Sequence, residues 1–157
     1  MEFQSLHKFY YILFLSILFL SSFLAQAKVT FKYCDQKGNY AVKVSGIEIS
    51  PNPVVSGEPA NFKISASSGK AISGGEVVIG VSYIGVTVHT ERIDLCQEVT
   101  CPVSNGNFLI SHTQTLPSIT PPGPYALKVT LTDNSGELLT CIKFNFKIVF
   151  GSLVSDI

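Results

Sequence analysis

The chain has 157 residues, 46% of them hydrophobic, and its 11 basic and 11 acidic side chains give a formal net charge of +0. Nucleic-acid binding depends on a surplus of Lys and Arg that neutralises phosphates, so this balance argues against a nucleic-acid partner. The high apolar and low charged content argues equally against a disordered chain.

The first residues have the pattern of a secretory signal peptide. Lys8 precedes an apolar block (residues 9–24) that leads to Ala25-Gln26-Ala27, a small-residue cleavage site. The alternative is a membrane anchor, but the block is short for the ~20 residues that span a bilayer, and the small-residue site favours cleavage. We therefore expect a signal peptide over residues 1–27 and one domain of ordinary size over residues 28–157.

The remainder alternates between apolar and polar side chains with the period of two that is typical of strands. Clusters of Gly, Pro, Asn and Asp separate the alternating runs and predict turns. In the second run the apolar phase changes after Gly46, which predicts a bulge. The predicted strands cover residues 31–34, 40–50, 60–67, 77–88, 108–116, 125–131 and 142–148.

The longest strand-forming run lies between Gly74 and Pro102. Its inner face is predicted to carry Val77, Ile79, Val81 and Tyr83. After Ile84-Gly85 the apolar phase moves to Val86 and Val88, which places His89 on the opposite face. This pattern predicts two strands, or one strand kinked at Gly85.

These strands predict an all-β protein without a helix. The expected architecture is an immunoglobulin-like β-sandwich of about seven strands in two antiparallel sheets. The inward faces carry many large apolar and aromatic side chains, which would either fill an ordinary core or line an apolar pocket between the sheets.

Four cysteines, Cys34, Cys96, Cys101 and Cys141, all follow the predicted signal peptide. In a secreted chain an even number of cysteines indicates disulfides, and four allow three connectivities. The spacing favours a local Cys96–Cys101 loop, which leaves Cys34 and Cys141 to join the ends of the domain. A zinc site is the alternative, but paired C-x-x-C spacing is missing.

No catalytic motif stands out. The stretch Gly80–Gly85 has one residue too many for the G-x-S-x-G elbow of hydrolases. His89 and His112 are predicted to lie at the surface or rim, each on the polar side of its strand, and Glu91 and Asp94 to be solvated beside Arg92. We therefore expect no enzyme activity, no catalytic residue, no metal and no cofactor.

Three stretches together resemble the ML (lipid-recognition) domain family, which includes soluble cholesterol carriers and secreted plant lipid-binding proteins. The first is Ile49-Ser50-Pro51-Asn52-Pro53 followed by Gly57, and the second is the loop from Cys96 to Pro102. The third is Pro122-Gly123-Pro124-Tyr125 with Thr132-Asp133 and Leu138-Leu139-Thr140-Cys141. The resemblance implies a two-sheet fold with a lipid between the sheets, and disulfides Cys34–Cys141 and Cys96–Cys101.

The resemblance also implies a function. The expected protein is a monomeric carrier or sensor that holds one sterol or phospholipid, touches membranes transiently and works with a membrane-protein partner. Its expected location is the secreted (apoplastic) space or a vacuolar, lysosome-like lumen. The alternative is a secreted interaction module in defence or stress signalling with a filled core. The residues expected to line the pocket are Val42, Val44, Phe62, Ile64, Ile79, Val81, Tyr83, Tyr125, Leu127, Val129, Phe144 and Phe146.

Overall fold

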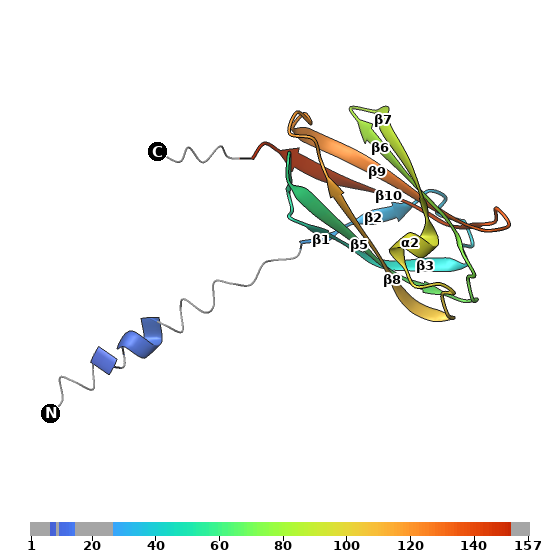
Figure 1. Cartoon of the computed structure of the whole chain (residues 1–157), viewed down its shortest axis with the longest axis horizontal. Coiled ribbons are helices and arrows are strands. Elements are labelled where there is room, and N and C mark those ends of the chain that lie inside the picture. The colour runs from blue at the N-terminus through green and yellow to red at the C-terminus, as the bar shows by residue number, and fades with distance from the viewer. Residues whose placement is uncertain (1–6, 9, 15–26, 152–157) are drawn as a thin grey trace.

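The computed structural model describes residues 7, 8, 10–14 and 27–151. Within this part of the chain, ten strands form two sheets that pack face to face (Figure 1). The strands are β1 (Ala27–Val29), β2 (Phe31–Tyr33), β3 (Val42–Ser50), β4 (Val54–Val55), β5 (Pro59–Ser68), β6 (Gly75–Tyr83), β7 (Val86–Asp94), β8 (Gly106–Thr115), β9 (Gly123–Asp133) and β10 (Leu138–Val149). The predicted all-β sandwich is confirmed.

Most of the predicted signal peptide, namely residues 1–6, 9 and 15–26, lies outside the described residues. In the part that is described, no helix has the length and the apolar content that a membrane crossing requires.

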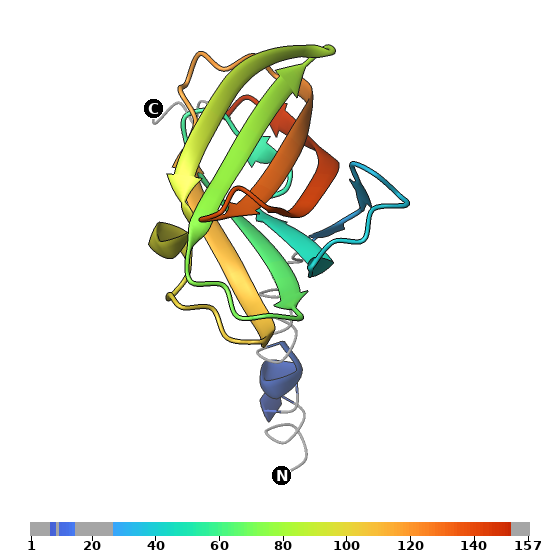
Figure 2. The same ribbon diagram turned by 90° about the vertical axis from the view of Figure 1, so that its right-hand side faces the viewer.

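One edge strand of each sheet, β7 in one and β8 in the other, lies on the same side of the molecule. One sheet has the order β1-β3-β5-β8, and the other has the order β2-β10-β9-β6-β7 with β4 beside β10. Every pairing is antiparallel except that of β4 with β10. Figure 2 shows the yellow-green β7 and the orange-yellow β8 on one side, next to a short helix. In the described part of the chain, no backbone ladder joins β7 to β8 on that side.

The predicted strands are all present, and two features lie where the apolar phase changes. The register of β3 against β5 shifts between Val44 and Gly46, which confirms the bulge. The long run is two strands, β6 and β7, joined at Ile84 and Gly85. Both residues have positive φ, 49° and 77°, as a two-residue hairpin turn of this hand requires.

Three short elements were not predicted. Strands β1 and β4 are three and two residues long, too short for a pattern of alternation to be visible. Helix α2 (Leu95–Glu98) corrects the expectation of a chain without helix. It forms inside the small disulfide loop, where the Asp94 side chain caps it by accepting a hydrogen bond from the Cys96 backbone N–H at 2.7 Å.

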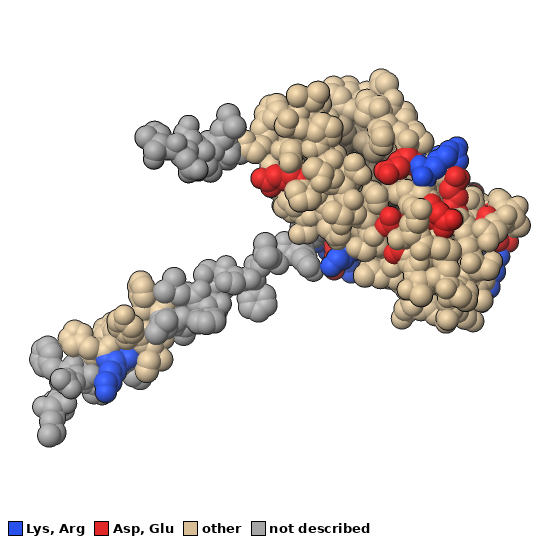
Figure 3. Space-filling model, in the orientation of Figure 1, with Lys and Arg blue, Asp and Glu red and all other residues tan. Residues whose placement is uncertain are grey.

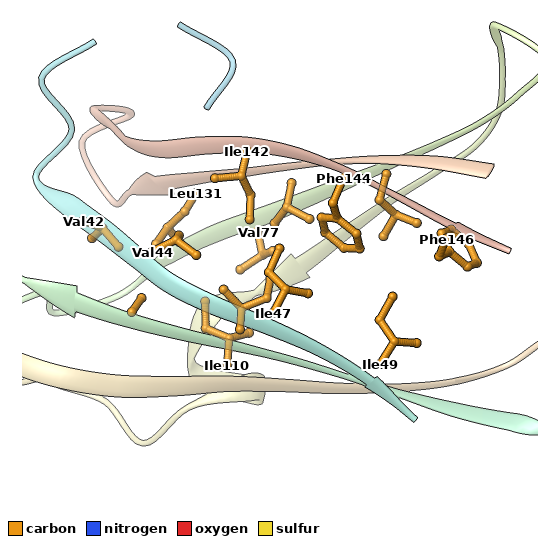
Figure 4. Close-up of a cluster of buried hydrophobic side chains, with 14 of the residues drawn as sticks. Val42, Val44, Ile47, Ile49, Val77, Ile110, Leu131, Ile142, Phe144 and Phe146 are labelled. Carbon is orange, nitrogen blue, oxygen red and sulfur yellow. The ribbon is translucent and has the colours of Figure 1, made fainter. Parts of the chain in front are cut away.

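The core lies between the sheets, and both sheets contribute side chains to it. Figure 4 shows Val42, Val44, Ile47 and Ile49 of β3 facing Ile142, Phe144 and Phe146 of β10. The alternation of buried and exposed residues along β10 follows the period of two that the sequence predicts. Burial of these side chains provides the main favourable contribution to folding.

Two disulfides tie the sandwich together. Cys34, just after β2, is bonded to Cys141 of β10 across a sequence separation of 107 residues. Cys96 and Cys101 are bonded across a separation of 5 residues and close the loop that contains α2. Both pairs match the connectivity that the spacing favours, and the described part of the chain has no free cysteine.

Candidate functional site

A cavity of about 400 Å³ lies between the two sheets. It extends from the core toward the side where β7 and β8 face each other, and its innermost walls are apolar. A volume of this size lies within the range of small-molecule sites. The lining residues are Phe62, Ile64, Val77, Ile79, Val81, Val88, His89, Glu91, Ile93, Glu98, Ile110, His112, Gln114, Leu116, Pro117, Thr120, Leu127, Val129, Phe144 and Phe146.

The position of the cavity follows from which sheet edges pack together. Near β3 the sheets are filled by buried side chains such as Val42, Ile47 and Ile142, which are at most 1% exposed. On the opposite side, β7 and β8 turn several polar side chains inward, and burying polar groups without partners costs free energy. The sandwich therefore stays open along this side.

The structure brings eight of the twelve predicted lining residues together around the cavity. They are Phe62, Ile64, Ile79, Val81, Leu127, Val129, Phe144 and Phe146. The prediction was wrong for Val42 and Val44, which are buried but lie in the filled part of the core. Figure 4 places both beside Leu131, at the opposite end of the core from Phe146.

Tyr83 and Tyr125 also do not line the cavity. Their rings stack on each other with centroids 4.7 Å apart, and Tyr125 packs against Phe146 at 5.7 Å. The Tyr125 hydroxyl donates a hydrogen bond to the Pro121 carbonyl at 2.9 Å. Burial, and then the neighbouring Tyr83, raise the pKa of Tyr125. The tyrosine pair therefore packs beside the loop between β8 and β9 and is hydrogen-bonded to it. That loop contributes Pro117 and Thr120 to the lining of the cavity.

Sequence reasoning missed most of the lining from β7 and β8. The cross-strand partners of Val81 and Ile79 are His89 and Glu91, so these polar side chains face inward with them. On the other sheet His112 pairs with Phe62 and therefore also faces inward. Placing either histidine on the outer, polar face was wrong, although both do lie at the rim. The sequence did contain a signal for this orientation. Ile93 lies two residues from Glu91 and four from His89, and Ile110 lies two residues from His112. Residues an even number of positions apart on a strand share a face, so these apolar residues indicate which side chains point inward.

A cluster of ionisable groups bridges the two sheets at the rim. The Nδ1 of His112 lies 3.2 Å from Glu98 Oε1 on α2, and its Nε2 lies 3.7 Å from Glu91 Oε2 on β7. The side chains of His112 and Glu98 are 16% and 13% exposed, so this is a largely shielded contact. It joins β8 to both β7 and α2 next to the cavity.

The other charged residues near the rim have structural partners. Arg92 pairs with Glu76 through a 2.8 Å contact on the outer face rather than with Glu91 or Asp94. Asp94 caps α2. The described residues contain no group of three or more His, Cys, Asp and Glu side chains arranged to hold a metal ion.

Known proteins resemble this chain over most of its length. The MD-2-related lipid-recognition protein ROSY1 of Arabidopsis thaliana is 33% identical over 145 residues, which are 87% of each chain. A phosphatidylglycerol/phosphatidylinositol transfer protein of Aspergillus oryzae is 28% identical over 118 residues, covering 71% of this chain and 67% of that protein.

Solved structures share the fold at lower identity. A Niemann–Pick type C2 protein from the Japanese carpenter ant superposes with a TM-score of 0.63 at 19% identity, covering 76% of this chain and 99% of that one. Chicken MD-1 complexed with lipid IVa superposes with a TM-score of 0.52 at 17% identity, covering 78% of this chain and 96% of that one. A family model described as the ML domain matches residues 28–148. The chain therefore belongs to the ML domain family.

Proposed function

We propose that this protein is a lipid-binding and transfer protein that holds one sterol or phospholipid in the cavity between its sheets. The observation that carries the proposal is the apolar cavity itself, which is continuous with the core and reaches the surface between β7 and β8. Burying a few hundred Å² of lipid surface at roughly 25 cal/mol per Å² contributes several kcal/mol, which is sufficient to hold a lipid outside a membrane transiently. Relatives named as lipid-transfer and lipid-recognition proteins support the same function.

Lipid exchange requires contact with a membrane, and one end of the molecule is suited to it. Ile84 and Val86, at the β6–β7 turn, are 77% and 65% exposed, and Ile119 in the β8–β9 loop is 87% exposed. A hydrogen bond from the Tyr83 hydroxyl to the Pro122 carbonyl at 3.4 Å joins these two segments. Figure 3 shows no charged side chain at the very top of the domain, and an acidic side chain lies lower, at the left margin. In the proposal these apolar tips enter the lipid surface beside the cavity mouth.

The predicted signal peptide and the two disulfides support a location in an oxidising compartment. The proposed sites of action are therefore the secreted space or a vacuolar lumen, where the protein exchanges lipid with membranes as a soluble carrier.

Lipid uptake by matched β6 variants tests the proposal. Purified full-length protein is mixed with phosphatidylcholine vesicles that contain either a fluorescent sterol or a phospholipid with a fluorescent acyl chain. Val81→Asp places a charge in the cavity wall and is expected to abolish uptake, because an unpaired buried carboxylate disfavours an apolar ligand. Val78→Asp, on the outer face of the same strand, serves as the control and is expected to keep uptake.

Ile79→Phe provides a second test, because it places a larger apolar side chain in the wall of the cavity. Thermal unfolding verifies that each variant is folded. If folded Val81→Asp and Ile79→Phe proteins take up lipid as well as the unmodified protein does, the cavity is not the binding site. If the unmodified protein takes up neither lipid, the interaction-module alternative replaces the carrier.

A further inference from the structure

At the mouth of the cavity the two sheets are joined by side chains rather than by backbone pairing. The edge strands β7 and β8 belong to different sheets, and within the described residues no ladder connects them. His112 of β8 crosses this gap. Its Nδ1 lies 3.2 Å from Glu98 Oε1 on α2, and its Nε2 lies 3.7 Å from Glu91 Oε2 on β7. Figure 2 shows α2 beside these two strands. The cluster therefore spans the opening through which a ligand reaches the cavity.

Protonation of His112 decides whether the ring attracts both carboxylates. A neutral imidazole has one N–H donor and one acceptor nitrogen, whereas an imidazolium donates from both nitrogens. The Glu98 contact at 3.2 Å is within hydrogen-bond distance, so a neutral ring keeps it through an Nδ1–H group. The Glu91 contact at 3.7 Å is longer than a hydrogen bond and is attractive only when the ring is charged. The contact of β8 with β7 therefore depends on protonation, whereas its contact with α2 persists in both forms.

No other charged group replaces His112 in this position. Among the described residues that line the cavity there is no lysine, arginine, aspartate or tyrosine, and the one further titratable side chain is His89 of β7. The cross-strand neighbour of His112 on β5 is the apolar Phe62. His89 shares the inward face of β7 with Glu91, and a positive charge on it repels a charged His112. The attraction across the mouth in acid therefore comes from His112 and the two carboxylates.

We propose that His112 is a pH-dependent latch, which holds β7 against β8 when it is protonated and releases β7 when it is neutral. Histidine is the side chain that ordinarily changes its charge between about pH 5 and pH 8, whereas a glutamate ordinarily stays ionised over that range. The contact with Glu91 is therefore present in acid and is lost as the pH rises. The cavity admits and releases lipid faster at neutral pH than in acid. The inference rests on the proposed lipid-binding function and adds a regulation of the same cavity.

The test measures how fast bound lipid leaves the protein at two pH values. Full-length protein is loaded with the fluorescent sterol or fluorescent phospholipid of the uptake experiment. It is then mixed with an excess of unlabelled phosphatidylcholine vesicles at about pH 5.5 and at about pH 7.5, on either side of the ordinary histidine range. Release is expected to be about two- to fivefold faster at the higher pH, which is what a partly exposed ion pair is worth. Equal rates, or faster release in acid, overturn the inference.

Variants assign the pH dependence to this contact. His112→Gln cannot be protonated in this range and is expected to release lipid at the same rate at both pH values. Glu91→Gln removes the carboxylate on β7 and is expected to abolish the difference as well. Glu76→Gln, which removes a carboxylate from the outer face of the sheet, is the matched control and is expected to keep the difference. His89→Gln is expected to keep it too. Because Glu91 is 36% exposed, its variant tests the latch even if His112→Gln does not fold.

A measurement without lipid separates the latch from the function on which it rests. In lipid-free His89→Gln protein, NMR follows the His112 ring and the backbone amides of β7 as the pH is changed. The β7 amide shifts are expected to follow the titration of the His112 ring, and to stop changing over this range when His112→Gln is added. Amides that do not respond, or a pH-dependent release that persists in folded His112→Gln protein, overturn the latch and leave the lipid-binding proposal in place. Failure of the unmodified protein to take up any lipid overturns that proposal, while the NMR titration still decides whether His112 is coupled to β7.

Discussion

At the scale of single residues, Ile84 occupies a backbone conformation that suits asparagine or glycine far better. It has a φ of 49° and lies with Gly85 between the paired residues Tyr83 and Val86. Two-residue hairpins of this type favour Asn-Gly, because a β-branched side chain clashes with the backbone at positive φ. Burial cannot offset the strain, since Ile84 is 77% exposed. A strained apolar side chain at an exposed tip supports the proposed role in membrane contact.

Substitution of this residue should separate stability from transfer. Ile84→Asn is expected to stabilise the fold by about 1 kcal/mol, because asparagine tolerates the left-handed conformation. The same change is expected to slow lipid transfer between vesicles, because it removes apolar surface from the tip. Denaturant unfolding and a vesicle-to-vesicle transfer assay measure the two effects.

The neighbouring loop provides a control for this prediction. Ile119 is even more exposed than Ile84 but is not among the described residues with positive φ. Ile119→Asn should therefore slow transfer without the gain in stability. An undiminished transfer rate in both variants would exclude these tips from the membrane contact.

At the scale of elements, strand positions could be predicted from the sequence, but the inward face of β7 could not. Period-two alternation located all the longer strands and the inner face of β6, which carries Val77, Ile79 and Val81. The pairing of β6 with β7 shifts register between Val81 and Ser82, so the phase that Val86 and Val88 suggest does not continue along β7. A bulge of this kind depends on the partner strand and leaves little mark on the sequence. The polar rim was missed for this reason.

The outer face of the larger sheet carries a row of like charges. Lys143 of β10 is directly opposite Lys32 of β2 on one side and Lys128 of β9 on the other. All three are exposed, and no ion pair is found for them in the described part of the chain. Like charges opposite each other on neighbouring strands destabilise a sheet.

Reversal of the central charge should therefore stabilise the sheet. Lys143→Glu replaces two repulsive cross-strand neighbours by two attractive ones, and each such pair is worth roughly 0.2–1 kcal/mol. Urea unfolding at low and high salt measures the gain, which should shrink as salt is added. Lys147→Glu, opposite the uncharged Pro124, is the control with the same change in net charge. Equal stability of the two variants would show that the row of lysines is not repulsive.

At the scale of the whole molecule, the fold and the deepest part of the cavity could be predicted because they depend on alternation alone. Eight lining residues, including Phe62, Phe144 and Phe146, lie on inward faces that alternation identifies. Alternation identifies a buried face but not whether that face packs against a side chain or against a cavity. Val42 and Val44 were therefore assigned to the lining, although the sheets are closed at their position.

The two disulfides make unequal contributions to this architecture, and their removal should show it. Replacing Cys34 and Cys141 by alanine opens a closed loop with a separation of 107 residues, which in the chain-entropy model costs about 5 kcal/mol. Replacing Cys96 and Cys101, separated by 5 residues, costs about 2 kcal/mol in the same model. Because the smaller loop holds α2 and Glu98 at the rim, its removal should alter lipid selectivity more than stability. Denaturant unfolding measures the loss of stability, and mass spectrometry of the lipids bound to the re-isolated protein measures the change in selectivity. Equal losses of stability in the two variants would contradict the expected division between a bridge that stabilises the sandwich and one that positions the rim.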